Sequence, residues 1–445
     1  MRPSALLERA RTTLPEGTFA VGAGLGVAAI TAYIFVIVAL NALGDNDEAV
    51  AGFSALWAIV FVAGLGLFQP LEQEISRAVA HRNAQGIGGG PVIKRAARFG
   101  AAMAAVVCVI ALALYPVLTE HLFHGQGMLV FAFVIALSAH AVMHLARGAL
   151  SGNARFGPYG FMIGAEGTAR FLAAVALMIA GVTAAGPYGL LLGLAPYVAV
   201  ILTMRKQRGL IVDGPPAPWS EIAPALGFLL VGSVATQALA YAPLMAIGIL
   251  AGPGDQKIVA VFTTAFFLAR VPVLMFMAVQ AALLPKLAKY TGAGRHDDFR
   301  AALRQLFVVV IGVAVLGVIL AALLGPIAGE ILFKNFDPNI VSARDLALLA
   351  AGSGGLIVAL TAAQALIALD GHAHAMWGWL AGVVGFLLGV SLISDLLLRV
   401  EIGFLAGAML SALVMGALLL ARMRRGLPTD TRPLVEAIEH EQFEF

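Results

Sequence analysis

Charged side chains are scarce in this sequence of 445 residues: 12% are Asp, Glu, Lys or Arg, whereas 60% are hydrophobic. A soluble protein of this length needs roughly 25% charged residues to cover its surface. The mean hydropathy is +0.93. This composition excludes an ordinary soluble enzyme and predicts a protein whose solvent is lipid.

Several other features are missing. The single cysteine, Cys108, lies in an apolar run and cannot form a disulfide within the chain. The glycine-rich segment 86–90 lacks the Lys-Ser/Thr of a phosphate-binding loop, so we expect no nucleotide hydrolysis. Acidic residues of the expected loops are scattered rather than paired, which disfavours a membrane-bound enzyme or a metal site. We expect no cofactor and no nucleic acid partner.

Long apolar runs dominate what is present. Runs of about 18–25 residues match the thickness of the hydrocarbon core, and in lipid they must be helices because backbone groups find no water there. We therefore predict an all-α membrane protein of about 12 transmembrane helices. The predicted spans lie near 19–43, 49–69, 97–118, 127–149, 157–181, 184–204, 223–250, 258–284, 305–328, 346–369, 376–393 and 402–421. Gly22 and Gly26 form a small-xxx-small pair that suits close helix packing.

Lys and Arg are distributed unevenly between alternate loops. With the N-terminus inside, the inside segments carry 22 of the 28 Lys and Arg residues and the outside loops carry four. Basic residues favour the cytoplasmic side. Both termini are therefore predicted to be cytoplasmic.

Two short sequences recur at similar spacing. PVLTEHLF (116–123) returns as PIAGEILF (326–333), and ALSGNAR (149–155) returns as ALDGHAH (368–374). Repeats at equivalent spans predict two six-helix halves in the same orientation. The predicted divisions are a cytoplasmic amphipathic N-tail (1–18), an N-terminal half (19–204), a linker rich in Pro and Gly (205–221), a C-terminal half (222–421) and a cytoplasmic C-tail (422–445).

Arg270 is the most conspicuous charge within a span, because it lies near the middle of the eighth, two residues before Pro272. Intramembrane charges usually face a cavity or a partner. Gln237 and Tyr241 add polar groups to the seventh span, and all three residues are candidates for substrate binding. Arg270 has alternative roles, namely binding backbone carbonyls at a broken helix or pairing with Glu166.

Two sets of polar residues lie within the spans of the first half. Glu166 and Arg170 stand four residues apart, so they share a helix face and can pair. His140, His144 and Arg147 follow one face of the fourth span. Arg170, Arg147 and the two histidines are candidates for substrate binding, and Glu166 is a weak candidate for ion coupling. The alternatives are a structural ion pair and ordinary interhelical hydrogen bonds.

The sign of these charges indicates a substrate class. Within the spans we count Arg170 and Arg270 against Glu166 alone, which predicts a net positive interior. A pump for organic cations would instead hold an unpaired buried carboxylate. Because guanidinium binds two oxygens at once, a positive cavity lined by Arg favours a phosphate group.

Three segments carry a family resemblance: LEQEISRAVA (71–80), RGALSGNARFGPYG (147–160) and FLARVPVLMFMAVQAALLPK (267–286). Together with the spans over roughly 15–425, they resemble the multidrug/oligosaccharidyl-lipid/polysaccharide (MOP) superfamily, in particular its polysaccharide-biosynthesis flippases. Major-facilitator transporters also have two parallel halves. Their signature loop between spans 2 and 3 needs an Asp, however, and residues 76–98 contain none.

The resemblance implies a fold and a cargo. It implies two pseudo-symmetric six-helix bundles around a central cavity, like those of MATE (multidrug and toxin extrusion) and other MOP transporters. The cargo would be a polyprenyl-(pyro)phosphate-linked saccharide, moved from the inner to the outer leaflet of the bacterial cytoplasmic (inner) membrane. Arg270 and Arg170 would neutralise its phosphates, and Arg147 could capture them first.

Other properties stay open. The coupling ion could be H⁺ or Na⁺. Partners would be membrane lipids and polysaccharide assembly enzymes, and we expect a monomer. The alternatives are a MATE-like ion-coupled drug or cation antiporter and an inactive transporter-like scaffold for cell-wall assembly.

Overall fold

The computed structural model describes residues 18–424, apart from 45, 222–225, 253, 272, 274–295 and 370. Throughout this part the chain is helical, and it contains no strand. The described residues form 13 α-helices, namely α2 (Thr18–Leu43), α3 (Asp47–Ala84), α4 (Gly90–Ala113), α5 (Tyr115–Val117), α6 (Met128–Gly152), α7 (Phe156–Ile179), α8 (Ala185–Met204), α9 (Leu226–Leu250), α10 (Gln256–Ala269), α12 (His296–Leu332), α13 (Ala343–Ile367), α14 (His372–Ser391) and α15 (Leu396–Arg424). Two short helical turns, η1 (Leu118–Leu122) and η2 (Trp219–Glu221), complete the set.

Eleven helices of the described part are long and apolar enough to cross a membrane. They correspond to eleven of the twelve predicted spans. The remaining predicted span, 258–284, begins as α10. Most of its residues after Arg270 lie outside the described part of the chain. The largest boundary errors are at α3, which continues to Ala84, well past residue 69, and at α12, which starts at His296 rather than near 305. In both cases polar residues extend the helix beyond its apolar run.

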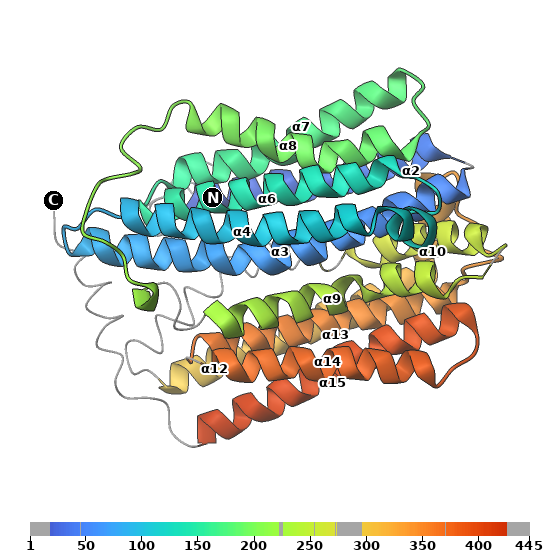
Figure 1. Cartoon of the computed structure of the whole chain (residues 1–445). Helices are drawn as coiled ribbons and strands as arrows, with labels where there is room; N and C mark the ends of the chain where they lie inside the picture. Colours follow the sequence, from blue (N-terminus) through green and yellow to red (C-terminus); the bar gives the residue numbers. More distant parts are fainter. Residues whose placement is uncertain are drawn as a thin grey trace, which may run out of the picture.

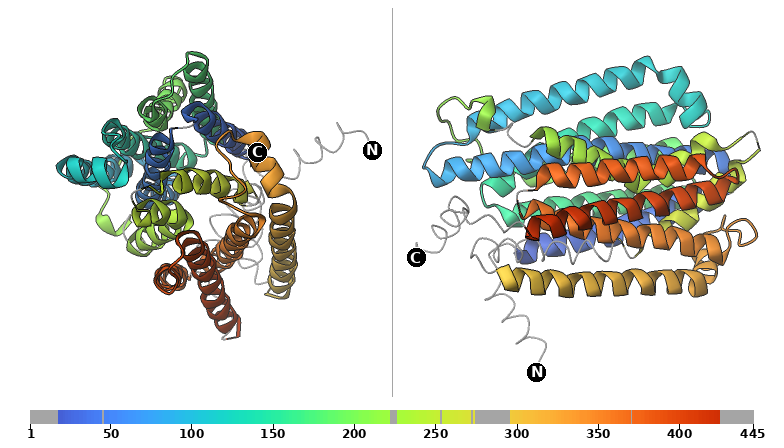
Figure 2. Two further views of the ribbon diagram at one scale, coloured as in Figure 1. Left: turned by 90° about the vertical axis from the view of Figure 1, so that its right-hand side faces the viewer. Right: turned by 90° about the horizontal axis from the view of Figure 1, so that it is seen from below.

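The helices form two bundles (Figure 1). The first holds α2 to α8 and the second holds α9 to α15; they pack together along α3 and α9, and α10 contacts α3 of the first bundle and α13 of the second. Figure 2 shows the blue-to-green helices on one side and the orange-to-red helices on the other. We call the end that carries residues 84–90 and 205–221 the linker end, and the opposite end the far end.

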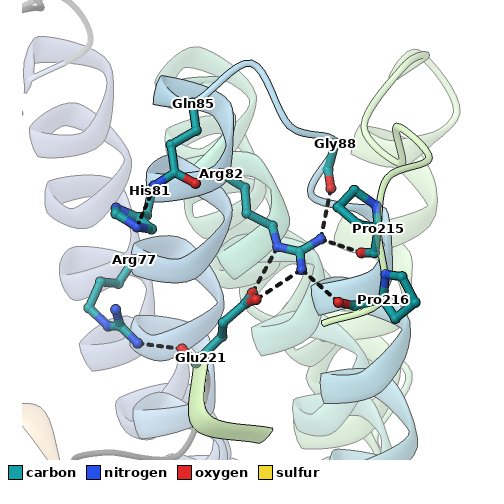
Figure 3. A network of polar contacts seen from close by, with 8 residues as sticks. All are labelled: Arg77, His81, Arg82, Gln85, Gly88, Pro215, Pro216 and Glu221. Carbon is teal, nitrogen blue, oxygen red and sulfur yellow. Dashed lines mark hydrogen bonds and ion pairs between the residues drawn. The ribbon is translucent and has the colours of Figure 1, made fainter. Parts of the chain in front are cut away.

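Arg82 fastens the linker to the first bundle (Figure 3). Its guanidinium donates to the Glu221 carboxylate at 2.8 and 3.1 Å and to the Pro215, Pro216 and Gly88 carbonyls at 2.8, 3.3 and 3.2 Å. Arg82 itself is buried. These hydrogen bonds from Arg82 lower the pKa of Glu221 below its usual value.

Close packing of α2 on α7 depends on glycine. A Cβ at Gly24 would collide with the backbone of Gly160, and a Cβ at Gly160 would collide with that of Ala20. By contrast, a Cβ at Gly22 or Gly26 would meet nothing within 4 Å. The predicted small-xxx-small pair was therefore wrong, because it lies on a different face of α2 from the one that contacts α7.

Candidate functional site

A buried polar network joins three helices of the first bundle around Glu72. The Glu72 carboxylate lies 2.6 Å from Nδ1 of His144 and accepts a hydrogen bond of 2.8 Å from the Tyr159 hydroxyl. Arg147 forms an ion pair with it at 3.2 Å and also donates to the Tyr159 oxygen at 2.9 Å. Glu72 comes from α3, His144 and Arg147 from α6, and Tyr159 from α7. Both carboxylate oxygens therefore have partners, as a buried charge requires.

Glycines on α6 bring these groups together. A Cβ at Gly148 would lie 2.9 Å from the Glu72 carbonyl oxygen, and one at Gly152 would lie 2.9 Å from the Ser76 carbonyl oxygen. Only residues without a Cβ let α6 approach α3 so closely. His144 lies one turn before Gly148, and Arg147 directly precedes Gly148. The close approach of α6 to α3 therefore places both side chains beside Glu72.

The predicted pair in the middle of α7 is present. Arg170 lies 3.1 Å from Glu166, and its guanidinium carbon lies 5.4 Å from the ring centre of Phe35 and 5.7 Å from that of Trp57. Arg170 is 4% exposed. His140, also buried, lies at hydrogen-bond distance (2.8 Å) from the Ala136 carbonyl through Nδ1. Arg170 thus has a carboxylate partner and two aromatic faces already.

Arg270 ends α10 beside the second bundle. Its Nη1 donates to the Ala240 carbonyl of α9 at 2.6 Å, and its guanidinium carbon lies 4.6 Å from the ring centre of Tyr241 and 5.0 Å from that of Phe266. Pro243, three residues after Ala240, lacks an N–H and disturbs the preceding turn of α9. In the part of the chain that the structure describes, Arg270 has no carboxylate partner.

A series of ring contacts connects the Glu72 network with Arg270 across the two bundles. The ring of His144 lies 6.1 Å from that of His140, His140 lies 6.4 Å from Phe61, and Phe61 stacks on Tyr241 at 5.4 Å. The Tyr241 ring in turn packs against the Arg270 guanidinium. Gln237, one turn before Tyr241 on α9, is half-buried. Four candidates predicted separately in the two halves, His140, His144, Tyr241 and Arg270, therefore lie on one series of contacts through the boundary between the bundles.

The two bundles are also joined at the far end of this boundary. The Asn41 side chain donates to the Leu332 carbonyl at 2.7 Å and accepts from the Lys334 N–H at 2.8 Å, which joins α2 to the end of α12. Nearer the middle of the helices, the rings of Trp57 on α3 and Phe267 on α10 meet edge to face at 5.5 Å. Hydrogen bonds at the far end and aromatic packing further in together hold the two bundles.

The predicted count of interior acids was wrong. Among the described residues, Glu72 and Glu401 are also buried within helices, at 6% and 0% exposure, so Glu166 is not the sole acid there. Arg147 and Arg170 are each matched by a carboxylate. Of the three predicted phosphate-binding arginines, only Arg270 has none among the described residues.

Within the described ranges, no three His, Cys, Asp or Glu side chains are grouped to hold a metal ion. What the site offers is a guanidinium for an anion, amphipathic aromatic rings beside it and a hydrogen-bonded network of ionisable groups behind it. Such groups bind and orient a charged ligand.

No family model matches the chain, and no curated protein matches it in sequence. Its structure is similar to an inward-facing multidrug resistance MATE family transporter of the MOP superfamily, with a TM-score of 0.70 and 15% identity over 91% of this chain and 95% of that one. An outward-facing MATE family structure gives a TM-score of 0.61 at 15% identity, over 92% of this chain and 96% of that one.

A MOP superfamily transporter from Pyrococcus furiosus, described as having a binding pocket of reversed polarity, gives a TM-score of 0.66 at 14% identity. That match covers 92% of this chain and 95% of the other. The chain therefore has the MATE-like fold.

Proposed function

We propose that this chain is a membrane transporter that moves an anionic, polyprenyl-(pyro)phosphate-linked saccharide from the inner to the outer leaflet by alternating access. In this proposal the linker end faces the cytoplasm of a bacterium, as do both termini, and the protein acts as a monomer without catalysing a reaction. Its cargo is used in the assembly of cell-envelope polysaccharide.

The observation that carries the proposal is the state of Arg270. A half-buried guanidinium that has no carboxylate partner among the described residues favours an anionic ligand, because the ligand supplies the missing charge. The Ala240 carbonyl occupies one Nη1 position. The remaining N–H donors are sufficient for a phosphate, which a guanidinium can bind through two oxygens.

The other predicted residues take more limited roles. The Tyr241 ring packs against the Arg270 guanidinium. Gln237, one turn earlier on α9, lies where it can contact a sugar hydroxyl. Arg147 and Arg170 are held by Glu72 and Glu166, so a phosphate would have to compete with a carboxylate already in place. We therefore assign phosphate binding to Arg270 first, and treat the Glu72 network as the part that fixes α6 against α3 and α7.

Two bundles suit this cargo mechanically. The glycan and phosphate need a polar route, whereas the polyprenyl tail stays in lipid. Bundles that separate at one end at a time allow the head group to enter between them while the tail remains outside. In this proposal the far-end contacts of Asn41 join the two bundles on the outer side and have to break when that side opens.

A MATE-like cation antiporter is the second candidate. It is favoured by the fold, and by Glu72, a buried carboxylate of the kind that binds protons or cations. Against it, Glu72 already has three partners and Glu166 is paired with Arg170. Since a neighbour of the same fold is described as having reversed pocket polarity, similarity of fold does not decide the sign of the substrate.

Conditional depletion of the protein distinguishes the lipid-linked saccharide transporter from the cation antiporter. Polyprenyl-linked saccharides are extracted, and their leaflet is determined by sidedness labelling in membrane vesicles. We expect a lipid-linked saccharide to accumulate on the cytoplasmic leaflet and to return to normal on re-expression. An unchanged pool, accompanied by new sensitivity to cationic dyes, would favour the antiporter.

A further inference from the structure

The second bundle contains a buried acid that the transport site does not use. Glu401 lies on α15, five residues after the helix begins at Leu396, or about 8 Å along its axis from the far end. The residue is 0% exposed. Neither oxygen of its carboxyl group has a hydrogen-bond partner. An ionised carboxylate in this state would lose its hydration without compensation.

A second acid lies beside Glu401 and, unlike it, has hydrogen-bond partners on both carboxylate oxygens. Asp345, at the start of α13, accepts the backbone N–H and the hydroxyl of Ser342, both at 2.7 Å, on one oxygen. Its other oxygen accepts Nε and Nη2 of Arg344 at 2.9 and 2.6 Å. Four donors, two of them charged, stabilise the ionised form of Asp345.

The charged groups that act on Glu401 are Asp345, Arg344 and Asp395. Two of the three are negative, and the Arg344 guanidinium is directed at Asp345 while its side chain is 64% exposed. Arg399, on the same helix, donates to the Leu250 carbonyl. The balance around Glu401 therefore opposes a negative charge, and a protonated carboxyl can donate its one O–H to the neighbouring carboxylate.

We propose that Glu401 and Asp345 form a proton-binding site at the far end of the second bundle, in which Glu401 carries the proton and the ionised Asp345 accepts its hydrogen bond. Both residues lie close to the ends of their helices, so a proton reaches them from the far side of the membrane by a short route. Ser342 and Arg344 supply the four hydrogen bonds that hold the Asp345 carboxyl group in place. Use of this proton to drive transport rests on the proposed function, but its binding does not.

Infrared spectroscopy of the purified full-length protein tests the site without a substrate. A protonated carboxylic acid has a C=O stretching band that is distinct from carboxylate bands and shifts in D₂O. We expect this band at neutral pH in the wild-type protein and its loss in Glu401→Gln. Glu330→Gln, a change at an exposed glutamate near the far end of α12, is the matched control and should retain the band.

Stability provides an independent measurement. Glutamine mimics a protonated glutamate, so Glu401→Gln should fold and melt like the wild-type protein at neutral pH. At alkaline pH the wild-type melting temperature should fall as Glu401 loses its proton, while that of the variant should not. Failure of Glu401→Gln to fold would overturn the proposal, because it would show that the native side chain is needed as a carboxylate.

Sodium chloride in place of potassium chloride tests the rival ligand. A melting temperature raised by Na⁺ in the wild-type protein but not in Glu401→Gln would overturn proton binding in favour of a sodium site. Absence of the protonated-acid band at neutral pH would overturn it as well. Neither result bears on the transport assay, so the site and the proposed function can fail separately.

Discussion

Replacing Glu72 by glutamine tests whether the network in the first bundle is held together by charge. The change keeps the size of the side chain but leaves Arg147 without its carboxylate. The glutamine amide cannot serve both sides: with its oxygen toward His144, its NH2 faces Arg147, and with its oxygen toward Arg147 and Tyr159, its NH2 faces Nδ1 of His144. The second arrangement moves the His144 proton to Nε2, an atom that has no partner. Breaking a buried ion pair by removing one partner costs about 3–5 kcal/mol.

We expect the lower end of that range, about 3 kcal/mol, because the Arg147 side chain is 18% exposed and can recover some hydration. The assay is unfolding of the purified protein in detergent, followed by helix content. Glu72→Gln, Arg147→Met and the double variant form a cycle. The double variant should be more stable than the sum of the single effects predicts, by about 2 kcal/mol.

Glu74 and Arg77, on the same helix as Glu72, form the pair for a control double-mutant cycle. Glu74 is buried but pairs with Arg77, whose side chain is 52% exposed, at 2.8 Å. Pairs open to solvent contribute about 0–1 kcal/mol, so Glu74→Gln and Arg77→Met should be nearly additive. Equal additivity in the Glu72 cycle would refute the reasoning, because it would mean that Glu72 and Arg147 do not stabilise each other.

The far-end and linker contacts give further predictions. Asn41→Ala should speed hydrogen exchange of the Lys334 amide about fivefold, through loss of a hydrogen bond of about 1 kcal/mol, whereas Asn41→Asp, which keeps the accepting oxygen, should protect it. Arg82→Ala should make the linker much more sensitive to chymotrypsin, while Arg77→Ala, which removes a single contact to the Glu221 carbonyl, should have little effect. Because Arg82 lowers the pKa of Glu221, their pairing contributes fully above the usual glutamate value of about 4.3. Resistance of the linker to an acid-active protease should therefore persist at neutral pH and be lost as the pH falls through the lowered pKa. Resistance that instead declined on raising the pH would contradict this sign.

The helices and part of the site were accessible from the sequence. Apolar runs long enough to cross a bilayer leave little choice of structure, so the span positions agree with the helices described. Spacing along one helix also predicted the pairing of Glu166 with Arg170. It likewise predicted that His140, His144 and Arg147 share a face, since both patterns depend only on helix geometry.

Contacts between helices were not accessible in the same way. Glu72 lies beyond the predicted end of its span, where hydropathy falls, and only the close approach of α6 at Gly148 shows that it is buried. Glu401 stands one residue before a predicted span, so the predicted spans left it out. On α2, several glycines are equivalent in sequence, and only the partner helix distinguishes Gly24 from the others.

The central claim is that Arg270 binds the phosphate of a lipid-linked saccharide. In cells depleted of the native protein, Arg270→Ala, Arg270→Lys and the exposed control Arg304→Ala are expressed to equal levels in the membrane. The fraction of lipid-linked saccharide on the cytoplasmic leaflet is then measured. We predict that Arg304→Ala restores the normal distribution, Arg270→Lys restores it in part and Arg270→Ala leaves the saccharide on the cytoplasmic leaflet. Full restoration by Arg270→Ala would contradict the claim.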